Sequence, residues 1–227
     1  MKLKKEINYM SKIIFRLAKP SDAKQIATIH WSVRERYSDG IFLGLGRSFL
    51  KKYYSIILND PYEVIVCAEN ENGKVLGFSS ATQNVEKQSN NLRKHIFSLG
   101  FSAMFSLIKH PSLIKEIWIR YKSIRGDKDA PRFIGSTGCR GEYWCWLKDG
   151  EGSMLSSKVD TIRNMVLADL GEKYMLGEVD KKNESVLKYQ CGVNDAEVID
   201  EIVLPDGRER VIFRMELINN KKKMANK

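Results

Sequence analysis

A glycine-containing turn between a strand-like run and a helix-like run is the stretch of this chain best suited to bind a ligand. The turn covers residues 148–153 and contains Gly150 and Gly152. Glycine lets the backbone approach a ligand closely, and the first turn of a helix presents unpaired N–H groups and a partial positive charge. This combination predicts a phosphate-binding turn. An ordinary strand-to-helix connection without a ligand is the alternative interpretation of the same pattern.

The elements on the two sides of this turn differ in the period of their apolar residues. Residues 143–147 are aromatic or apolar at consecutive positions, which predicts a central strand covered on both faces. After the turn, apolar residues recur at helical spacing and predict the buried face of a helix: Leu155, Val159, Ile162, Met165 and Val166. Polar residues fall between them and predict its other face: Lys158, Asp160, Arg163 and Asn164.

The length and composition of the chain suit one globular domain. It has 227 residues, of which 43% are hydrophobic, enough for a sizeable core. We expect this domain to span residues 11–218, with basic, flexible tails at 1–10 and 219–227. The first residues are polar and carry no apolar run after their basic start, so we expect no secretory signal and a cytoplasmic location.

The charge and the possible metal ligands exclude two classes of partner. The formal net charge is +10, but part of the excess lies in the tails, and no nucleic-acid-binding motif accompanies it. We therefore expect no nucleic-acid partner. The cysteines form no C-x-x-C pair, and the histidines are scattered without ligand spacing: Cys67, Cys139, Cys145, Cys191, His30, His95 and His110. We expect neither a metal nor a disulfide.

The order of expected elements is β-α-α-β-β, a helical insertion, then β-α-β-α-β-β. The turn and periodicity signals place the strands at residues 13–17, 63–69, 74–80, 143–147, 173–179, 197–203 and 210–217. They place the helices after residue 20 and at residues 43–58, 155–166 and 183–190. We thus expect an α/β fold with a helical insertion at residues 85–132, between the third and fourth strands.

The insertion contains an unusually apolar helix. We expect helices at residues 90–109 and 112–124, broken at His110-Pro111. From Ile96 to Ile108 no charged residue occurs, and these thirteen residues are fewer than the ~20 needed to span a bilayer. From Arg93 to Arg125 there are seven Lys and Arg against one Glu. Burial against the domain or a homodimer partner is the favoured interpretation, and peripheral contact with an anionic membrane is the alternative.

Four segments resemble the GCN5-related N-acetyltransferases, the GNAT superfamily, and the resemblance covers most of the chain except the insertion and the tails. Residues 15–23, FRLAKPSDA, resemble the start of the family, and residues 73–78, GKVLGF, resemble its third strand. Residues 150–155, GEGSML, resemble the end of the coenzyme A loop, and residues 178–184, EVDKKNE, resemble the later strand-to-helix junction. The resemblance implies a mixed central sheet flanked by helices, with coenzyme A between these last two segments.

The activity implied by the resemblance is transfer of an acetyl or other acyl group from acyl-coenzyme A to an amine. The acceptor would be a small molecule, with an amino sugar of surface-polysaccharide synthesis suggested by analogy. The residues that would bind acetyl-coenzyme A are Trp144, Trp146, Leu147, Lys148, Gly150, Gly152, Ser153 and Asn183. Glu142, at the start of the strand, is the candidate base, and Tyr189 is the candidate acid for the leaving thiolate.

Several positions depart from the family pattern and keep other interpretations open. Leu147 stands where the family has Arg or Gln, so Lys148 would have to supply that charge. Tyr189 follows Asn183 by six residues, where the family commonly has seven. Glu142 would otherwise be a solvent-facing carboxylate at a strand end, and Tyr189 a core residue. The alternative functions are a GNAT-like binding module without turnover and a membrane-surface adaptor acting through the insertion.

Overall fold

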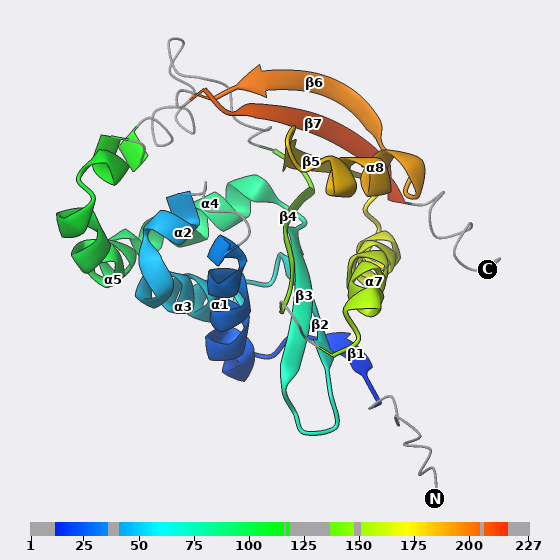
Figure 1. Cartoon of the computed structure of the whole chain (residues 1–227), viewed down its shortest axis with the longest axis horizontal. Helices are drawn as coiled ribbons and strands as arrows, with labels where there is room; N and C mark the ends of the chain where they lie inside the picture. The colour runs from blue at the N-terminus through cyan, green and yellow to red at the C-terminus, as the bar shows by residue number, and fades with distance from the viewer. Residues whose placement is uncertain are drawn as a thin grey trace, which may run out of the picture.

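The computed structural model describes residues 12–35, 41–115, 117–118, 137–147, 151–204 and 207–217. It contains a seven-stranded mixed sheet in the order β1-β2-β3-β4-β5-β7-β6 (Figure 1). Only the pairing of β4 with β5 is parallel in this sheet, and the other neighbours are antiparallel. The expected α/β class and the central position of the aromatic strand are therefore confirmed.

The elements follow the order that the sequence predicts. The strands are β1 (Ile14–Leu17), β2 (Glu63–Glu69), β3 (Val75–Thr82), β4 (Arg140–Trp146), β5 (Tyr174–Asp180), β6 (Glu197–Val203) and β7 (Glu209–Glu216). The helices are α1 (Ala23–Ser32), α2 (Ile41–Gly44), α3 (Gly46–Ile57), α4 (Val85–Lys94), α5 (Ile96–Lys109), α7 (Ser156–Asp169) and α8 (Glu184–Gly192). Short 3-10 turns precede or follow some of them: η1 (Pro20–Asp22), η2 (Val33–Glu35) and η3 (Ser153–Leu155).

The described part of the insertion differs from its expected boundaries. The single helix expected over residues 90–109 is two helices, α4 and α5, which are divided at His95. The first begins earlier than expected because Asn84 caps it, with the Asn84 side chain accepting the N–H of Lys87 at 3.0 Å. Helix α5 ends at Lys109, directly before His110-Pro111, as expected. Residues 119–136 and the expected tails at 1–10 and 219–227 lie outside the described residues.

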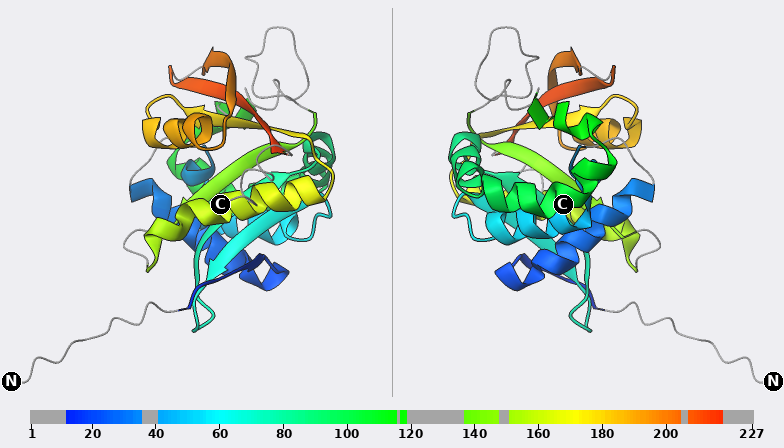
Figure 2. Two further views of the ribbon diagram at one scale, coloured as in Figure 1. Left: turned by 90° about the vertical axis from the view of Figure 1, so that its right-hand side faces the viewer. Right: turned by 90° about the vertical axis from the view of Figure 1, so that its left-hand side faces the viewer.

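Two layers of helices cover the two faces of the sheet (Figures 1 and 2). Helices α1 and α3 pack on one face, where Ile26, Leu50 and Phe78 are completely buried. Helix α7 crosses the opposite face, where Val159 packs with the strand residue Leu76. Helix α5 packs on the outer side of α3, away from the sheet. None of the described helices is both long and apolar enough to cross a membrane.

The face that α7 turns toward the sheet is more polar than the sequence predicts. Asp160, Arg163 and Asn164 are buried there, whereas Ile162 and Val166 are only partly buried. The expected division into an apolar and a polar face is therefore wrong for this helix. The reason is a buried network in which Asp160 and Arg163 form an ion pair at 2.7 Å with side chains 2% and 3% exposed.

The partners of this network come from β3 and α8. Ser79 of β3 donates to Asp160 at 3.0 Å, and Gln190 of α8 donates to its other oxygen at 3.3 Å. Arg163 donates to the carbonyl of Ser80 at 3.2 Å. Buried charges are tolerated when they are paired and hydrogen-bonded, which is how α7 accommodates these side chains against the sheet.

Removing one member of the buried ion pair should destabilise the fold. We expect Asp160→Asn to lower the free energy of unfolding by about 3–5 kcal/mol, because Arg163 would keep a buried, uncompensated charge. Urea denaturation followed by circular dichroism measures this loss. Glu184→Gln is the control, since the Glu184–Lys188 pair is exposed and should contribute little. Similar losses in both variants would contradict the structural role of the network.

Candidate active site

The candidate site begins where the two parallel strands β4 and β5 separate. Their ladder contains one pair of residues, Arg140 with Leu176, whereas β5 pairs with β7 along its whole length from Tyr174 to Asp180. Beyond Arg140 the facing edges of β4 and β5 no longer satisfy each other. Backbone N–H and C=O groups require partners, so these edges can bind an extended ligand chain.

The pairing of β4 with β3 identifies which backbone groups face this gap. Leu147 donates its N–H to the carbonyl of Leu76 at 2.8 Å, and Gly77 lies opposite Trp146. Because hydrogen-bonding direction alternates along a strand, the backbone groups of Trp144 and Trp146 point away from β3, toward β5. The N–H of Leu147, another residue predicted to bind the cofactor, is already used by β3.

The two tryptophan side chains have different surroundings. Trp146 is buried against Gly77, where a Cβ atom would lie 2.2 Å from the Trp146 ring, so its side chain belongs to the core. Trp144 is partly buried and donates its indole N–H to the carbonyl of Ser156 at 2.9 Å. Its ring also lies against Tyr189, with the ring centroids 5.0 Å apart. Trp144 thus connects β4 with the start of α7 and with α8.

A β-bulge in β4 sets the direction of the side chains. Trp144 pairs with Ser79 and Gly141 with Ala81, so Glu142 and Tyr143 together face one residue of β3. A bulge turns consecutive side chains toward the same face. Both Glu142 and Tyr143 accordingly lie on the side of the sheet that faces α3. After Tyr143 the side chains of the strand again alternate between the two faces. Tyr143 contacts the aromatic residues of that layer: His30, Phe42 and Tyr53.

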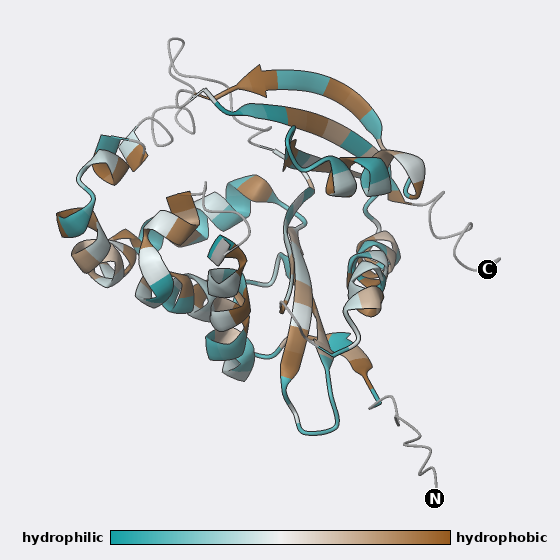
Figure 3. Cartoon of the chain, viewed as in Figure 1, coloured by the Kyte–Doolittle hydropathy of each residue, from teal (hydrophilic) through white to brown (hydrophobic). Residues whose placement is uncertain are grey.

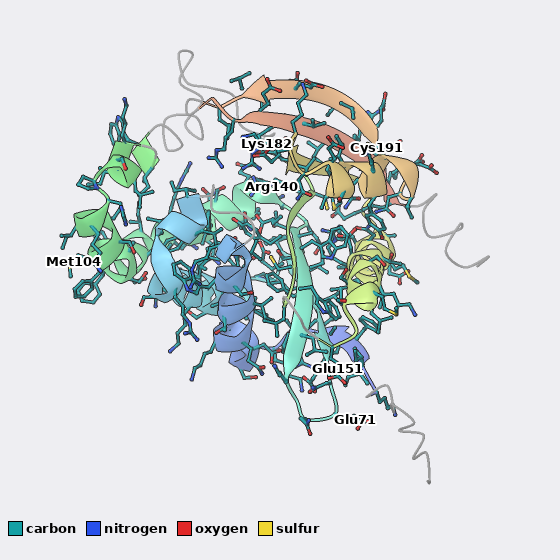
Figure 4. The ribbon with its side chains drawn as sticks, viewed as in Figure 1. Glu71, Met104, Arg140, Glu151, Lys182 and Cys191 are labelled. Atoms are coloured by element: carbon teal, nitrogen blue, oxygen red, sulfur yellow. The ribbon has the colours of Figure 1, made fainter. Side chains whose placement is uncertain are left out.

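Glu142 is buried and held by three donors. Its side chain is 5% exposed, so the interpretation of a solvent-facing carboxylate is wrong. One oxygen accepts from Arg140 at 2.8 Å and from Gln88 at 2.9 Å, and the other accepts from Tyr53 at 3.2 Å. Figure 4 shows Arg140 between α4 and β5, close to the level at which the strands separate. A carboxylate therefore lies beside the gap, in a fixed position.

Glu63 is a second carboxylate in this cluster, and the sequence does not single it out. Its Oε1 atom accepts from the same Gln88 nitrogen at 2.5 Å, which links it to Glu142. Its Oε2 atom is buried and has no hydrogen-bond partner among the described residues. Burial, and then the nearby charge of Glu142, raise the pKa of Glu63 well above its usual range. A charged residue at the start of a strand ordinarily indicates an exposed side chain. Here the packing of α4 covers the Glu63 carboxylate.

Tyr189 lies on the opposite face of β4 from Glu142. Its hydroxyl is 3.3 Å from the Thr161 hydroxyl and donates to the carbonyl of Ser157 at 3.4 Å. Burial raises the pKa of the Tyr189 phenol, a group that is protonated at neutral pH even at its ordinary pKa of about 10. The structure thus separates the candidate base from the candidate acid by the strand itself. Both can act on one ligand only if that ligand lies between β4 and β5.

Gly152, Ser153 and the start of α8 lie at the open end of the gap. Gly152 has a left-handed backbone with φ of 66°, and Ser153 begins η3 directly before α7. The N–H groups of a first helical turn have no partners within the helix. Asn183, at the end of β5, precedes α8 and is exposed. Lys148 and Gly150, also predicted to bind the cofactor, lie outside the described residues.

The histidine and the cysteines of the core have ordinary structural roles. His30 is buried and its Nδ1 atom lies 2.7 Å from the Tyr54 hydroxyl; burial lowers its pKa to about 3, so it is neutral. The four cysteines are free thiols, and burial raises the pKa of Cys67 and of Cys139 to about 12. The described residues contain no cluster of three or more His, Cys, Asp or Glu that could bind a metal ion.

Replacing Glu63 should change how stability depends on pH. The pKa of Glu63 is raised in the folded protein, so its ionisation favours the unfolded chain, and stability falls as pH rises above about 4.3. We expect Glu63→Gln to have little effect at pH ~4 and to become progressively more stabilising toward pH ~8. Urea denaturation across this range tests it, with the exposed Glu86→Gln as control. A stability difference that does not change with pH would contradict the burial of Glu63.

The fold has close counterparts among solved structures, although no protein-family model matches the sequence and a search of the curated proteins gives no match. A GNAT-family protein from Desulfovibrio desulfuricans aligns over 91% of this chain and 99% of its own, with 11% identity and a TM-score of 0.56. An N-acetyltransferase from Staphylococcus aureus covers the same shares, with 14% identity and a TM-score of 0.57. A chimeric spermidine N-acetyltransferase containing Vibrio cholerae sequence aligns over 93% of this chain and 99% of its own, with 10% identity and a TM-score of 0.55. The chain therefore has the fold of the GNAT acetyltransferases.

Proposed function

We propose that this protein transfers an acyl group from acyl-coenzyme A to the amine of a small molecule. The observation that carries this proposal is the early separation of β4 from β5, with the backbone groups of Trp144 facing the gap. Gly152 precedes α7 and Asn183 precedes α8, at the end of the gap where the two strands have separated. A structure with a TM-score of 0.54, from Salmonella typhimurium, was solved with its cofactor acetyl-CoA, which supports testing this ligand first.

Acyl-coenzyme A would bind with its phosphates at the turn and its extended arm in the gap. The N–H groups of Gly152 and Ser153 would contact the phosphates, helped by the positive end of α7. The arm would hydrogen-bond to the backbone of Trp144. Glu151 carries a charge of the wrong sign for phosphates, but its carboxylate accepts from Asn70 at 3.4 Å. This contact holds it toward the turn between β2 and β3.

The chemistry would use groups from both faces of β4. The attacking nitrogen forms a bond with the acyl carbon, and the bond from that carbon to sulfur breaks. The amine proton passes to the carboxylate pair of Glu142 and Glu63, directly or through one water. The leaving thiolate takes a proton from the Tyr189 phenol. We propose the linked pair as the base, rather than Glu142 alone. The three hydrogen bonds that Glu142 already accepts leave its carboxylate less able to accept the proton of the amine.

The charge of the cluster favours a cationic acceptor. Arg140 balances the charge of Glu142, so the ionised form of Glu63 adds a negative charge that would attract a protonated amine before it loses its proton. An amino sugar is the acceptor that the sequence resemblance suggests. A polyamine is the second acceptor to test, because one solved structure of this fold is a spermidine N-acetyltransferase chimera. Release of free coenzyme A, measured with both acceptors, compares them directly.

Substitution of the glycine turn should weaken ligand binding. We expect Gly152→Asp to reduce the affinity for acetyl-coenzyme A at least tenfold, about 1.4 kcal/mol, because it places a carboxylate against the phosphates. Isothermal titration calorimetry measures this change. Gly152→Asn is the matched control, since it has the same positive φ and the same close approach of a Cβ atom to Ile13, at 2.5 Å, but adds no charge, and it should weaken binding less. Unchanged affinity in Gly152→Asp would place the ligand elsewhere.

Substitution of the carboxylate pair should separate turnover from binding. We expect Glu142→Gln to lower kcat about 10²-fold while the affinity for acetyl-coenzyme A stays near that of the wild type. Glu63→Gln should lower the apparent pKa of the rising limb of the pH–rate profile, because it removes the negative charge that Glu63 places beside Glu142. If wild-type protein bound acetyl-coenzyme A but released no free thiol with either acceptor, the binding-module interpretation would be favoured.

A further inference from the structure

Helix α5 carries a continuous apolar stripe that the described residues leave uncovered. Phe97, Phe101, Phe105 and Ile108 recur at spacings of four, four and three residues, so they share one side of the helix. They are 90%, 76%, 78% and 69% exposed. Met104 belongs to the same side, and Figure 4 shows it at the outer edge of the molecule. Exposed apolar patches of this kind mark interaction surfaces.

The opposite side of α5 already accounts for its attachment to the domain. Leu99, Ala103 and Leu107 pack with the core cluster that contains α3. Ala103 is 2% exposed, whereas the outward phenylalanines contact little. In Figure 3 apolar segments recur along α5 at the edge of the molecule. The inward side of α5 is therefore enough to attach the helix to the domain. Packing within the domain does not explain the apolar residues of the outward stripe.

Both ends of the stripe are basic. No Asp or Glu occurs from Lys87 to Lys115. Arg93 and Lys94 precede the stripe, and Lys109 and Lys115 follow it. All four are exposed, and none forms an ion pair among the described residues. A surface that is apolar along its length and cationic at both ends matches a partner with an apolar interior and anionic groups at its boundary.

A second copy of this chain fits the surface poorly. Two α5 helices packed in parallel would bring Arg93 and Lys94 against the same residues of the copy. Two antiparallel helices would bring them against Lys109 and Lys115 of the copy. Either arrangement places like charges together at both ends of the contact, which opposes association. The charge pattern therefore favours an anionic surface over self-association.

We propose that α5 docks in the plane of an anionic lipid bilayer. The phenylalanines would enter the boundary between headgroups and acyl chains, and the lysines and arginines at both ends would contact lipid phosphates. Exposed apolar residues that follow α5 extend the contact: Ile114 is 55% and Trp118 is 57% exposed. Tryptophan is enriched at such interfaces.

This docking leaves the α7 side of the candidate active site free. Helix α3 lies between α5 and the sheet, and α7 and α8 lie on the far face, as Figure 2 shows from both sides. A bilayer against α5 would therefore cover neither Trp144 nor Tyr189. The proposal does not depend on acyl transfer, and either could fail alone.

Vesicle flotation of the full chain tests the proposal. We expect binding to phosphatidylcholine vesicles that contain about one third phosphatidylglycerol, and at least tenfold weaker binding to phosphatidylcholine alone. Raising the ionic strength to about 0.5 M should also weaken it, because the Debye length shortens. Phe101→Ser/Phe105→Ser should reduce binding at least tenfold without changing the circular dichroism spectrum, since both side chains are already exposed.

The control separates this stripe from exposed apolar residues in general. Leu170→Ser/Val203→Ser removes side chains that are 53% and 65% exposed on other elements, and it should bind vesicles like the wild type. Every variant keeps the basic tails, so the tails cannot account for a difference. No binding by the wild type, equal binding by the Phe101/Phe105 variant, or equal binding to both vesicle types would overturn the proposal. Sedimentation velocity tests self-association through the stripe. A wild-type dimer that does not bind vesicles, and that the Phe101/Phe105 variant dissociates, would also overturn the proposal.

Discussion

The single ladder pair between β4 and β5 is the constraint on which the rest of the structure depends. Because Arg140 and Leu176 alone connect the two strands in register, the sheet consists of two antiparallel parts with little direct pairing between them. The buried Asp160 on α7 compensates for this, since it accepts from Ser79 on one part and from Gln190 of α8 beside the other. The fold can thus hold a gap open in its centre without losing cohesion.

The bulge at Glu142 and Tyr143 determines what each side of that gap contains. It directs two consecutive side chains toward α3, so carboxylates gather on one face, while Trp144 and Tyr189 lie against each other on the other face. A ligand in the gap would therefore meet a proton acceptor from one side and a phenol from the other. The insertion contributes to this arrangement through α4, whose Gln88 joins the two carboxylates. Helix α5 instead faces away from the sheet.

Burial of polar residues near the gap gives the site its electrostatic character. The pKa of Glu63 is raised by desolvation and by the charge of Glu142, and desolvation also raises the pKa of Tyr189. Perturbed pKa values of this kind are common where acid–base chemistry occurs. His30 shows the contrast: it is also buried, but its one observed polar partner is the Tyr54 hydroxyl, and it remains a neutral core residue.

The sequence by itself determined the α/β class, the order of the elements and the central position of β4, because hydrophobic period and turn residues are local signals. It also located Glu142, Trp144 and Gly152 on the elements that border the gap. It could not show that Glu63 is buried, that α7 turns Asp160 toward the sheet, or that Glu142 and Tyr189 occupy opposite faces. Those facts depend on one bulge and on contacts between segments far apart in the chain, and only the tertiary structure decides such contacts.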